Sequence, residues 1–173
     1  MVDIVLSEQK FDEKKFEAFC GKYGFNFPKS HIEFLKNYND SELESNIIDG
    51  TEDLGIYIRY FYGTSNESYS NIENVYEQYA ARMPLKCVPI ADCDFGNQIC
   101  VSLNSESYGK IYFWDHETMD VDCGEKCKLN FDDMIFLADC FEDLLDKIIS
   151  FDTETIIEKK ESVFEKIKKM FKK

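Results

Sequence analysis

Three strand-like segments follow one another in the middle of the chain, and they constrain the fold more than any other feature. They are KCVPIA at residues 86–91, NQICVSL at 97–103 and GKIYFW at 109–114. Apolar residues alternate along the second and third segments, which is typical of strands with one buried face. Connections this short join neighbouring antiparallel strands. The sequence therefore predicts an antiparallel meander across residues 86–114.

Two more strands are predicted on either side of the meander. LGIYIRYFYG at residues 54–63 is largely apolar on both faces, so we expect a central strand covered on both sides. MIFLA at 134–138 predicts a short further strand. The polar and acidic run NYNDSELESNIIDGTED, residues 37–53, is interpreted as a connection that precedes the central strand.

The first helix is predicted to begin near Asp12, whose side chain suits the N-cap position. Phe11 and Phe16 have the spacing of a hydrophobic staple across that start. Gly21 and Gly24 are expected to end the helix, since glycine favours the left-handed conformation found there.

Three later helices are predicted from residues with the spacing of capping boxes. The pairs are Ser30–Glu33, Ser70–Glu73 (with Ser68 as another possible start) and Asp139–Glu142. The last of these helices is expected to extend through Ile148 and Ile149. A final amphipathic helix, with lysines on its polar face, is predicted over residues 153–170.

Helices at both ends of a strand-rich middle predict an α+β fold. We expect a mixed, mainly antiparallel sheet that is flanked by N-terminal and C-terminal helices. The length of 173 residues fits a single domain. That domain is expected to span residues 1–173, with its core at about 12–150 and an additional C-terminal amphipathic helix at 151–173.

Charge narrows the classes of partner. The chain has 34 Asp and Glu against 20 Lys and Arg, and its net charge is −14. Residues 156–173 hold seven lysines against three glutamates, so the remaining residues carry −18, of which −9 falls within 115–146. Such a chain repels nucleic acid and anionic membranes and attracts basic proteins. The acids are either a solvated surface or a docking face for a basic protein, and both interpretations stay open.

The seven cysteines are scattered through apolar or strand-like segments, which favours free thiols in a reducing compartment over a disulfide framework. The first residues, MVDIVLSEQK, lack the basic and apolar regions of a signal peptide. No apolar run approaches the roughly 18 residues that span a membrane. We therefore expect a cytoplasmic protein. For the lysine-rich last helix, a solvated face is favoured over contact with a membrane surface.

Nucleophilic catalysis needs a nucleophile and a base that can meet. The only histidines are His31 and His116. His31 lies in a predicted helix and is interpreted as a packing or surface residue. A pair of His116 with Cys87, Cys93 or Cys100 stays open, but no motif supports it. No glycine-rich phosphate loop is present. The sequence therefore predicts a protein that is not an enzyme.

The sequence contains two candidate metal sites, and it favours neither of them. Cys123 and Cys127 have a permitted but weak spacing for zinc, with His116 and Cys140 as further candidate ligands. The DCD run at 92–94 offers carboxylates to calcium, but Phe95 and Gly96 interrupt the alternation of oxygen ligands. We expect no metal and no cofactor, while a metal on the cysteine pair is left open.

The order of several motifs resembles the SUKH superfamily, the group related to the yeast cell-wall-synthesis regulator (Smi/Knr type). FNFPKSHIEFLKNYN is followed by YIRYFYG, VPIADCDFGNQICVSL, YGKIYFWDHE and FLADCFEDLLDKI. The resemblance covers about residues 12–150, and PIADCDFGN at 89–97 and GKIYFWDHE at 109–117 are its most specific parts. The chain departs from the family at Asn39-Asp40, at Cys93 and in residues 151–173, which bears on loop shape and partner identity.

The resemblance implies an α+β fold and a non-enzymatic binding protein. Bacterial members are largely immunity proteins encoded beside polymorphic toxins, and a typical member neutralises a cognate toxin, often a nuclease. A nuclease surface that holds phosphates is basic, so an acidic domain can occlude it by charge complementarity. We expect a cognate, basic toxin as the partner of a monomer or weak dimer. The alternative is a regulatory scaffold or adaptor like the eukaryotic relatives.

The expected contact residues are exposed acids in the bend and near the last strands. They are Asp92, Asp94, Asp115, Glu117, Asp120, Asp122 and Glu125. For Asp92 and Asp94 a structural role, in hydrogen bonds to turn amides, is an equal alternative. Trp114 is expected in the core rather than at the centre of an interface.

Overall fold

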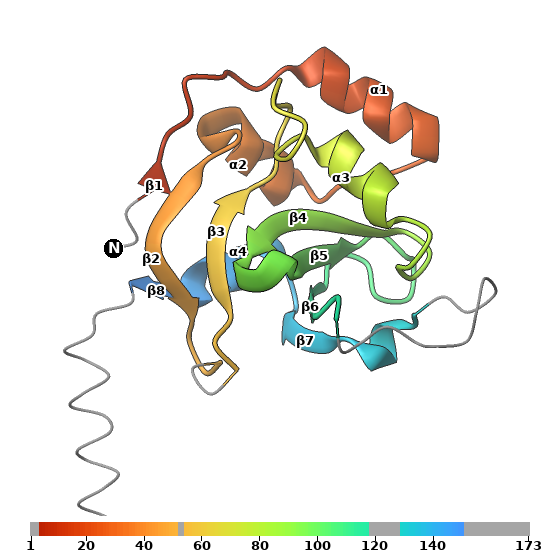
Figure 1. The fold of residues 1–173 in the computed structure, drawn as a ribbon. Coiled ribbons are helices and arrows are strands. Elements are labelled where there is room, and N and C mark those ends of the chain that lie inside the picture. Colours follow the sequence, from red (N-terminus) through yellow and green to blue (C-terminus); the bar gives the residue numbers. More distant parts are fainter. Residues whose placement is uncertain (1–3, 52–53, 118–128, 151–173) are drawn as a thin grey trace, which may run out of the picture.

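The protein is described by a computed structural model, which covers residues 4–51, 54–117 and 129–150 (Figure 1). The helices in these residues are α1 (Glu13–Tyr23), α2 (Lys29–Tyr38), α3 (Ile72–Tyr79) and α4 (Phe141–Lys147). The strands are β1 (Ile4–Val5), β2 (Glu42–Ile48), β3 (Tyr57–Phe61), β4 (Cys87–Cys93), β5 (Gln98–Ser102), β6 (Ile111–Trp114), β7 (Ile135–Ala138) and β8 (Ile148–Ser150). The α+β prediction is confirmed.

The strands form one sheet in the order β1-β2-β3-β4-β5-β6-β7, with β8 paired to β2. All strand pairs in the described residues are antiparallel. The predicted meander is confirmed as β4, β5 and β6, in which Cys100 pairs with both Pro89 and Tyr112. The central strand is confirmed as β3, but the expected cover on both sides is wrong. Ile58 and Phe61 are buried, whereas Tyr57 and Tyr60 are only partly buried and Arg59 is exposed. MIFLA contributes β7.

The prediction that residues 37–53 are a connection is wrong, because they contain β2. Leu43, Ile47 and Ile48 are buried there, and the strand pairs with β1, β3 and β8. The acids around these residues hide the apolar pattern, and the burial comes from partners that are distant in sequence. The predicted helical extension through Ile148 and Ile149 is wrong for the same reason, since both β-branched residues pair with β2 in β8.

The start of α1 agrees with the prediction. An Asp12 carboxylate oxygen accepts a hydrogen bond from the Lys15 backbone N–H at 3.1 Å. The Phe11 and Phe16 ring centroids lie 5.4 Å apart, and Gly24 closes the helix with a φ of 67°. The three predicted capping boxes are wrong: the N-caps are Pro28, Asn71 and Cys140.

At α3 the reason for the shifted cap is visible. The Asn71 side chain accepts hydrogen bonds from the backbone N–H groups of Glu73 and Asn74, whereas Ser70 is buried and its carbonyl accepts from Gly63. A cap one residue later therefore satisfies the open N–H groups of the helix.

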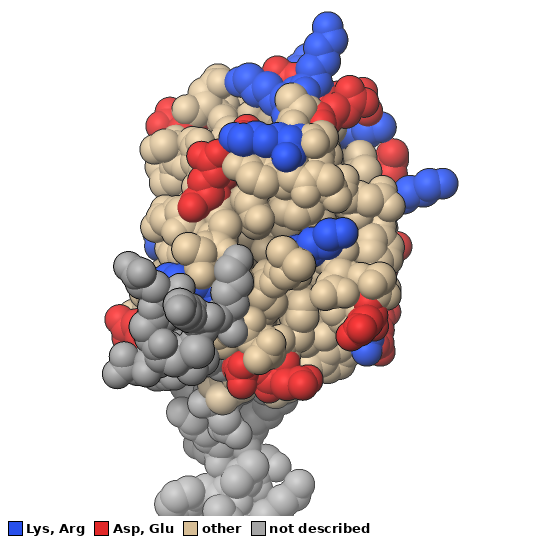
Figure 2. All heavy atoms as spheres, turned by 90° about the vertical axis from the view of Figure 1, so that its right-hand side faces the viewer, with Lys and Arg blue, Asp and Glu red and all other residues tan. Residues whose placement is uncertain are grey.

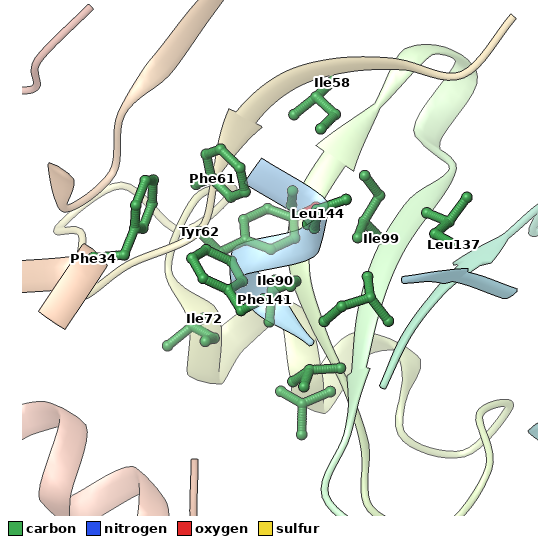
Figure 3. Close-up of a cluster of buried hydrophobic side chains, with 14 of the residues drawn as sticks. Phe34, Ile58, Phe61, Tyr62, Ile72, Ile90, Ile99, Leu137, Phe141 and Leu144 are labelled. Carbon is green, nitrogen blue, oxygen red and sulfur yellow. The ribbon is translucent and has the colours of Figure 1, made fainter. Parts of the chain in front are cut away.

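The main core lies between the sheet and the helices. Phe141 and Leu144 of α4 enter it together with Phe34 of α2 and Phe61 of β3 (Figure 3). The Phe34 ring centroid lies 4.7 Å from that of Phe61 and 5.1 Å from that of Phe141. A second, smaller hydrophobic cluster, separate from the main core, contains Trp114. Trp114 is fully buried, as expected.

Gly63, which follows β3, provides a test of the packing against the connection between α2 and β2. A Cβ at this position would lie 2.3 Å from Asn39 Oδ1 and 2.7 Å from the Asp40 backbone nitrogen. We expect Gly63→Ala to lower the free energy of unfolding by about 1–3 kcal/mol, measured by urea titration, because a backbone atom cannot give way cheaply. Gly21→Ala is the matched control, since nothing lies within 4 Å and alanine favours the helix. An equal loss in both variants would contradict this explanation.

Candidate functional site

The turn between β4 and β5 presents the most exposed large apolar side chain in the described residues. Asp94–Gly96 form one turn of 3-10 helix, visible in Figure 1 as the green coil beside β3. Phe95 is 86% exposed, and its φ of 63° places it in the left-handed region. Gly96 follows with a φ of 79°. A bulky residue in this region is an outlier, and such residues cluster at functional sites.

A buried polar network supports this turn from below. The Tyr62 hydroxyl lies 2.6 Å from Gln98 Oε1 and 3.2 Å from Asp92 Oδ1. The Gln98 side-chain amide donates to the Gly96 carbonyl at 2.8 Å. The Cys93 backbone N–H donates to the Asn97 carbonyl at 2.9 Å, which closes the turn. Networks in which buried polar groups find partners hold a single conformation.

Asp92 belongs to this network rather than to the exposed surface. It is only 6% exposed, so the expectation that it is an exposed acid is wrong: Asp92 pairs with Tyr60 in the sheet, and its carboxylate accepts hydrogen bonds from Tyr62 and Gln98. Burial raises the pKa of Asp92, while the Arg59 charge and the hydrogen bonds from Tyr62 and Gln98 oppose that shift. Arg59 Nη1 lies 3.3 Å from Asp92 Oδ2. Asp92 therefore lies in a structural network, but through the side chains of Tyr62, Gln98 and Arg59 rather than through the turn amides that were expected.

The segment after β6 lies against the turn. His116 donates its backbone N–H to Asn97 Oδ1 at 3.2 Å, and its ring Nδ1 lies 3.1 Å from the same oxygen. The Arg82 guanidinium lies 4.9 Å from the Trp114 ring centroid and donates to the His116 carbonyl at 2.5 Å. The two segments with the strongest family signature are thus held together.

This contact places three of the predicted contact residues at one end of the sheet. Asp94 and Asp115 are partly buried, and Glu117 is exposed. The Glu117 backbone N–H donates to Asp115 Oδ1 at 3.0 Å, so Asp115 also shapes its own loop. Asp120, Asp122 and Glu125 lie outside the described residues, and their role stays a prediction.

A groove runs along β3 from this turn, and we name it the β3 groove. Its volume is about 530 Å³. Its charged and aromatic lining comes from Glu42, Tyr57, Arg59, Tyr60, Tyr69 and Asp94. A hollow of about 290 Å³ adjoins it and adds the carboxylates of Asp40 and Glu67. Acids and tyrosines side by side suit a basic protein segment, because aromatic faces attract cations.

Charge is uneven over the rest of the surface. On the face shown in Figure 2, basic side chains gather toward the end that carries α1, and acidic side chains lie along the lower edge. Lys22 of α1 is paired there, with Glu73 at 2.8 Å and Glu77 at 2.6 Å. Acidic and basic side chains are therefore mixed at the α1 end.

The cysteines of the described residues are free thiols: Cys20, Cys87, Cys93, Cys100 and Cys140. Burial raises the pKa of the Cys93 and Cys100 thiols well above their ordinary value. A nucleophilic cysteine needs the opposite shift. The structure therefore gives the open Cys–His hypothesis no activated thiolate at either position.

Within residues 4–51, 54–117 and 129–150, no group of three or more His, Cys, Asp or Glu side chains is placed to hold a metal ion. Cys123 and Cys127 lie outside these ranges, so a metal on that pair stays an open hypothesis. No helix of the described chain is both long and apolar enough to cross a membrane.

The sequence missed the most distinctive residues of this site. Gly96 and Asn97 identified a bend, but an apolar residue between Asp94 and Gly96 gave no sign that its ring faces solvent. The link from Tyr62 to Gln98 joins residues 36 positions apart, and no local pattern reveals it. The one sequence signal for an unusual turn was the position of Phe95, a non-glycine residue between Asp94 and Gly96, which are both residue types common in turns.

Comparisons with known proteins agree with the resemblance. The model of the SMI1 / KNR4 family (SUKH-1) matches residues 10–147. The chain is also 28% identical over 155 residues to YokK, an SPbeta prophage-derived uncharacterized protein of Bacillus subtilis (strain 168). That match covers 76% of this chain and 73% of the relative.

Proposed function

The chain belongs to the SMI1 / KNR4 family (SUKH-1), and from this membership we propose that it is an immunity protein that binds and neutralises a cognate bacterial toxin. It acts by occlusion and without catalysis, in the cytoplasm, and its acidic surface meets a basic surface of the toxin. A nuclease is the favoured class of toxin, since its phosphate-binding surface is basic.

One observation carries the electrostatic part of this proposal. Asp94, Asp115 and Glu117 gather around a braced turn, next to a groove with further carboxylates. Complementary charge accelerates association and selects partners, and both effects weaken as salt rises. An immunity protein benefits from speed, because a toxin acts as soon as it is free.

The proposal includes a toxin gene beside this one, and it is tested with the purified toxin domain of that gene. We expect a 1:1 complex, with an association rate constant that falls about tenfold or more between 20 mM and 500 mM salt. The double variant Asp94→Asn, Glu117→Gln is expected to lower that rate and flatten the salt dependence. Glu17→Gln, Glu106→Gln is the matched control, since it removes two exposed acids that lie outside the turn and the β3 groove. Recovery of several host proteins and no toxin from cells would instead favour the scaffold alternative.

A further inference from the structure

We propose that Phe95 is the anchor of the toxin contact, and that its ring enters an apolar recess edged by Lys or Arg side chains on the toxin. The inference rests on the proposed function and adds the contact residue and the chemistry of the surface that receives it. Its basis is a juxtaposition: an exposed aromatic ring, a left-handed backbone, a braced turn and a border of carboxylates.

The stability of the fold does not explain why position 95 is a phenylalanine. At 86% exposure its ring contributes little burial to the fold, and its φ of 63° is a conformation that glycine adopts more easily. Gly96, the next residue, already has a φ of 79°. A glycine at position 95 would therefore suit the turn better. A side chain kept at a local energetic cost points to a use outside the folded monomer.

The turn is prepared for binding. Gln98 holds the Gly96 carbonyl, Asn97 is held by His116, and the Asn97 backbone N–H donates to the Asp94 carbonyl at 3.4 Å. A Cβ on Gly96 would lie 3.2 Å from a His116 ring carbon, which shows how closely the next segment packs. Little conformational freedom of the backbone remains to be lost on binding, and preorganisation of this kind raises affinity.

The carboxylates around the Phe95 ring favour a basic partner. Asp94 precedes it, and Asp115 and Glu117 lie on the segment held against the turn by His116. Aromatic anchors that enter a pocket and are surrounded by polar groups are typical centres of interfaces. Carboxylates around the ring repel anionic lipid headgroups, so a basic protein surface fits better than a membrane.

The decisive variant is Phe95→Gly, measured for stability and for binding to the adjacent gene's toxin domain. We expect the Tm to rise by about 2–4 °C, because the backbone strain is relieved. We expect the Kd to increase at least about 30-fold, as for an interface centre. Phe95→Leu, which keeps an apolar side chain, is expected to lose less. The control is Phe136→Ala, which removes an exposed phenylalanine from β7. Alanine is used there because glycine would weaken the strand.

Three results would contradict the proposal that Phe95 is the anchor of the toxin contact. If wild type binds the toxin and Phe95→Gly binds equally well, the proposed function stands and this inference fails. If Phe95→Gly loses stability together with binding, the residue has a structural role and the inference also fails. Wild-type binding to phosphatidylcholine vesicles that is lost in Phe95→Gly would replace the protein recess with a lipid surface.

A second probe decides the case in which the toxin domain does not bind at all. Heptakis(6-amino)-β-cyclodextrin has an apolar cavity with an ammonium rim, so it copies the proposed recess. We expect it to shift the backbone NMR signals of residues 94–97 and 115–117 in wild type and not in Phe95→Gly. Unmodified β-cyclodextrin, without the rim charges, is expected to bind more weakly. Absence of these shifts in wild type would overturn the inference whatever the toxin result.

Discussion

Phe141→Ala is expected to lower the free energy of unfolding by about 3–5 kcal/mol, one of the largest single losses that this chain can show. The Phe141 side chain is 1% exposed and joins three elements of the core. Its ring centroid lies 4.6 Å from that of His31, 5.1 Å from that of Phe34 and 6.0 Å from that of Phe61. Truncation removes the ring from between α2, α4 and β3 and leaves a cavity that rigid strands cannot fill.

Phe136→Ala is the matched control for this experiment. Phe136 is also a phenylalanine of the C-terminal half, but it is 48% exposed on β7. We expect its truncation to cost about 1 kcal/mol or less, because it removes little buried area. Urea titrations followed by circular dichroism measure both variants. Similar losses at the two positions would contradict the packing of α4 described above.

Acid is expected to destabilise the fold through His31. This side chain is fully buried, and burial lowers its pKa from 6.5 to about 3. Below about pH 6.5 the unfolded chain binds a proton at this histidine and the folded chain does not. The free energy of unfolding therefore falls as the pH falls, and it levels off near pH 3. Between pH 7 and pH 5 this histidine alone should cost about 2 kcal/mol of unfolding free energy.

His31→Leu separates this effect from the titration of carboxylates. The variant keeps an apolar side chain between Phe27 and Phe141 and removes two ring nitrogens that have no hydrogen-bond partner among the described residues. We expect it to be more stable than wild type at pH 7, because buried unpaired polar atoms are costly. The difference between the variant and wild type should widen by about 2 kcal/mol at pH 5. A constant difference would show that His31 takes up a proton as readily in the folded protein as in the unfolded chain, which would contradict its burial.

Much of the fold could be predicted because its signals are local. Alternation and short connections identified β4, β5 and β6, and the Asp12 cap with its phenylalanine staple identified α1. The errors fall where pairing with residues distant in sequence decides the secondary structure. Glu42–Ile48 becomes a strand only because β1, β3 and β8 bury it, and Ile148 leaves the α4 pattern only because β2 offers a partner.

The candidate site was predictable only in part. The acids were visible as residue types, and Asp94 and Glu117 are accessible enough to contact a partner, but the burial of Asp92 depends on Tyr62, 30 positions away. The exposure of Phe95 depends on a backbone angle that the sequence does not display. Contacts that are local in space but remote in sequence therefore carried what sequence reasoning missed.

The central claim is that this protein protects cells against a toxin, and a growth experiment tests it most directly. Cells carry the adjacent gene's toxin domain under one inducible promoter and this protein under another, and survivors are counted by plating. We predict that toxin induction alone kills the cells, and that co-expression of wild-type protein restores growth while an unrelated acidic protein does not. Equal killing with and without this protein, at confirmed expression of both, would contradict the account.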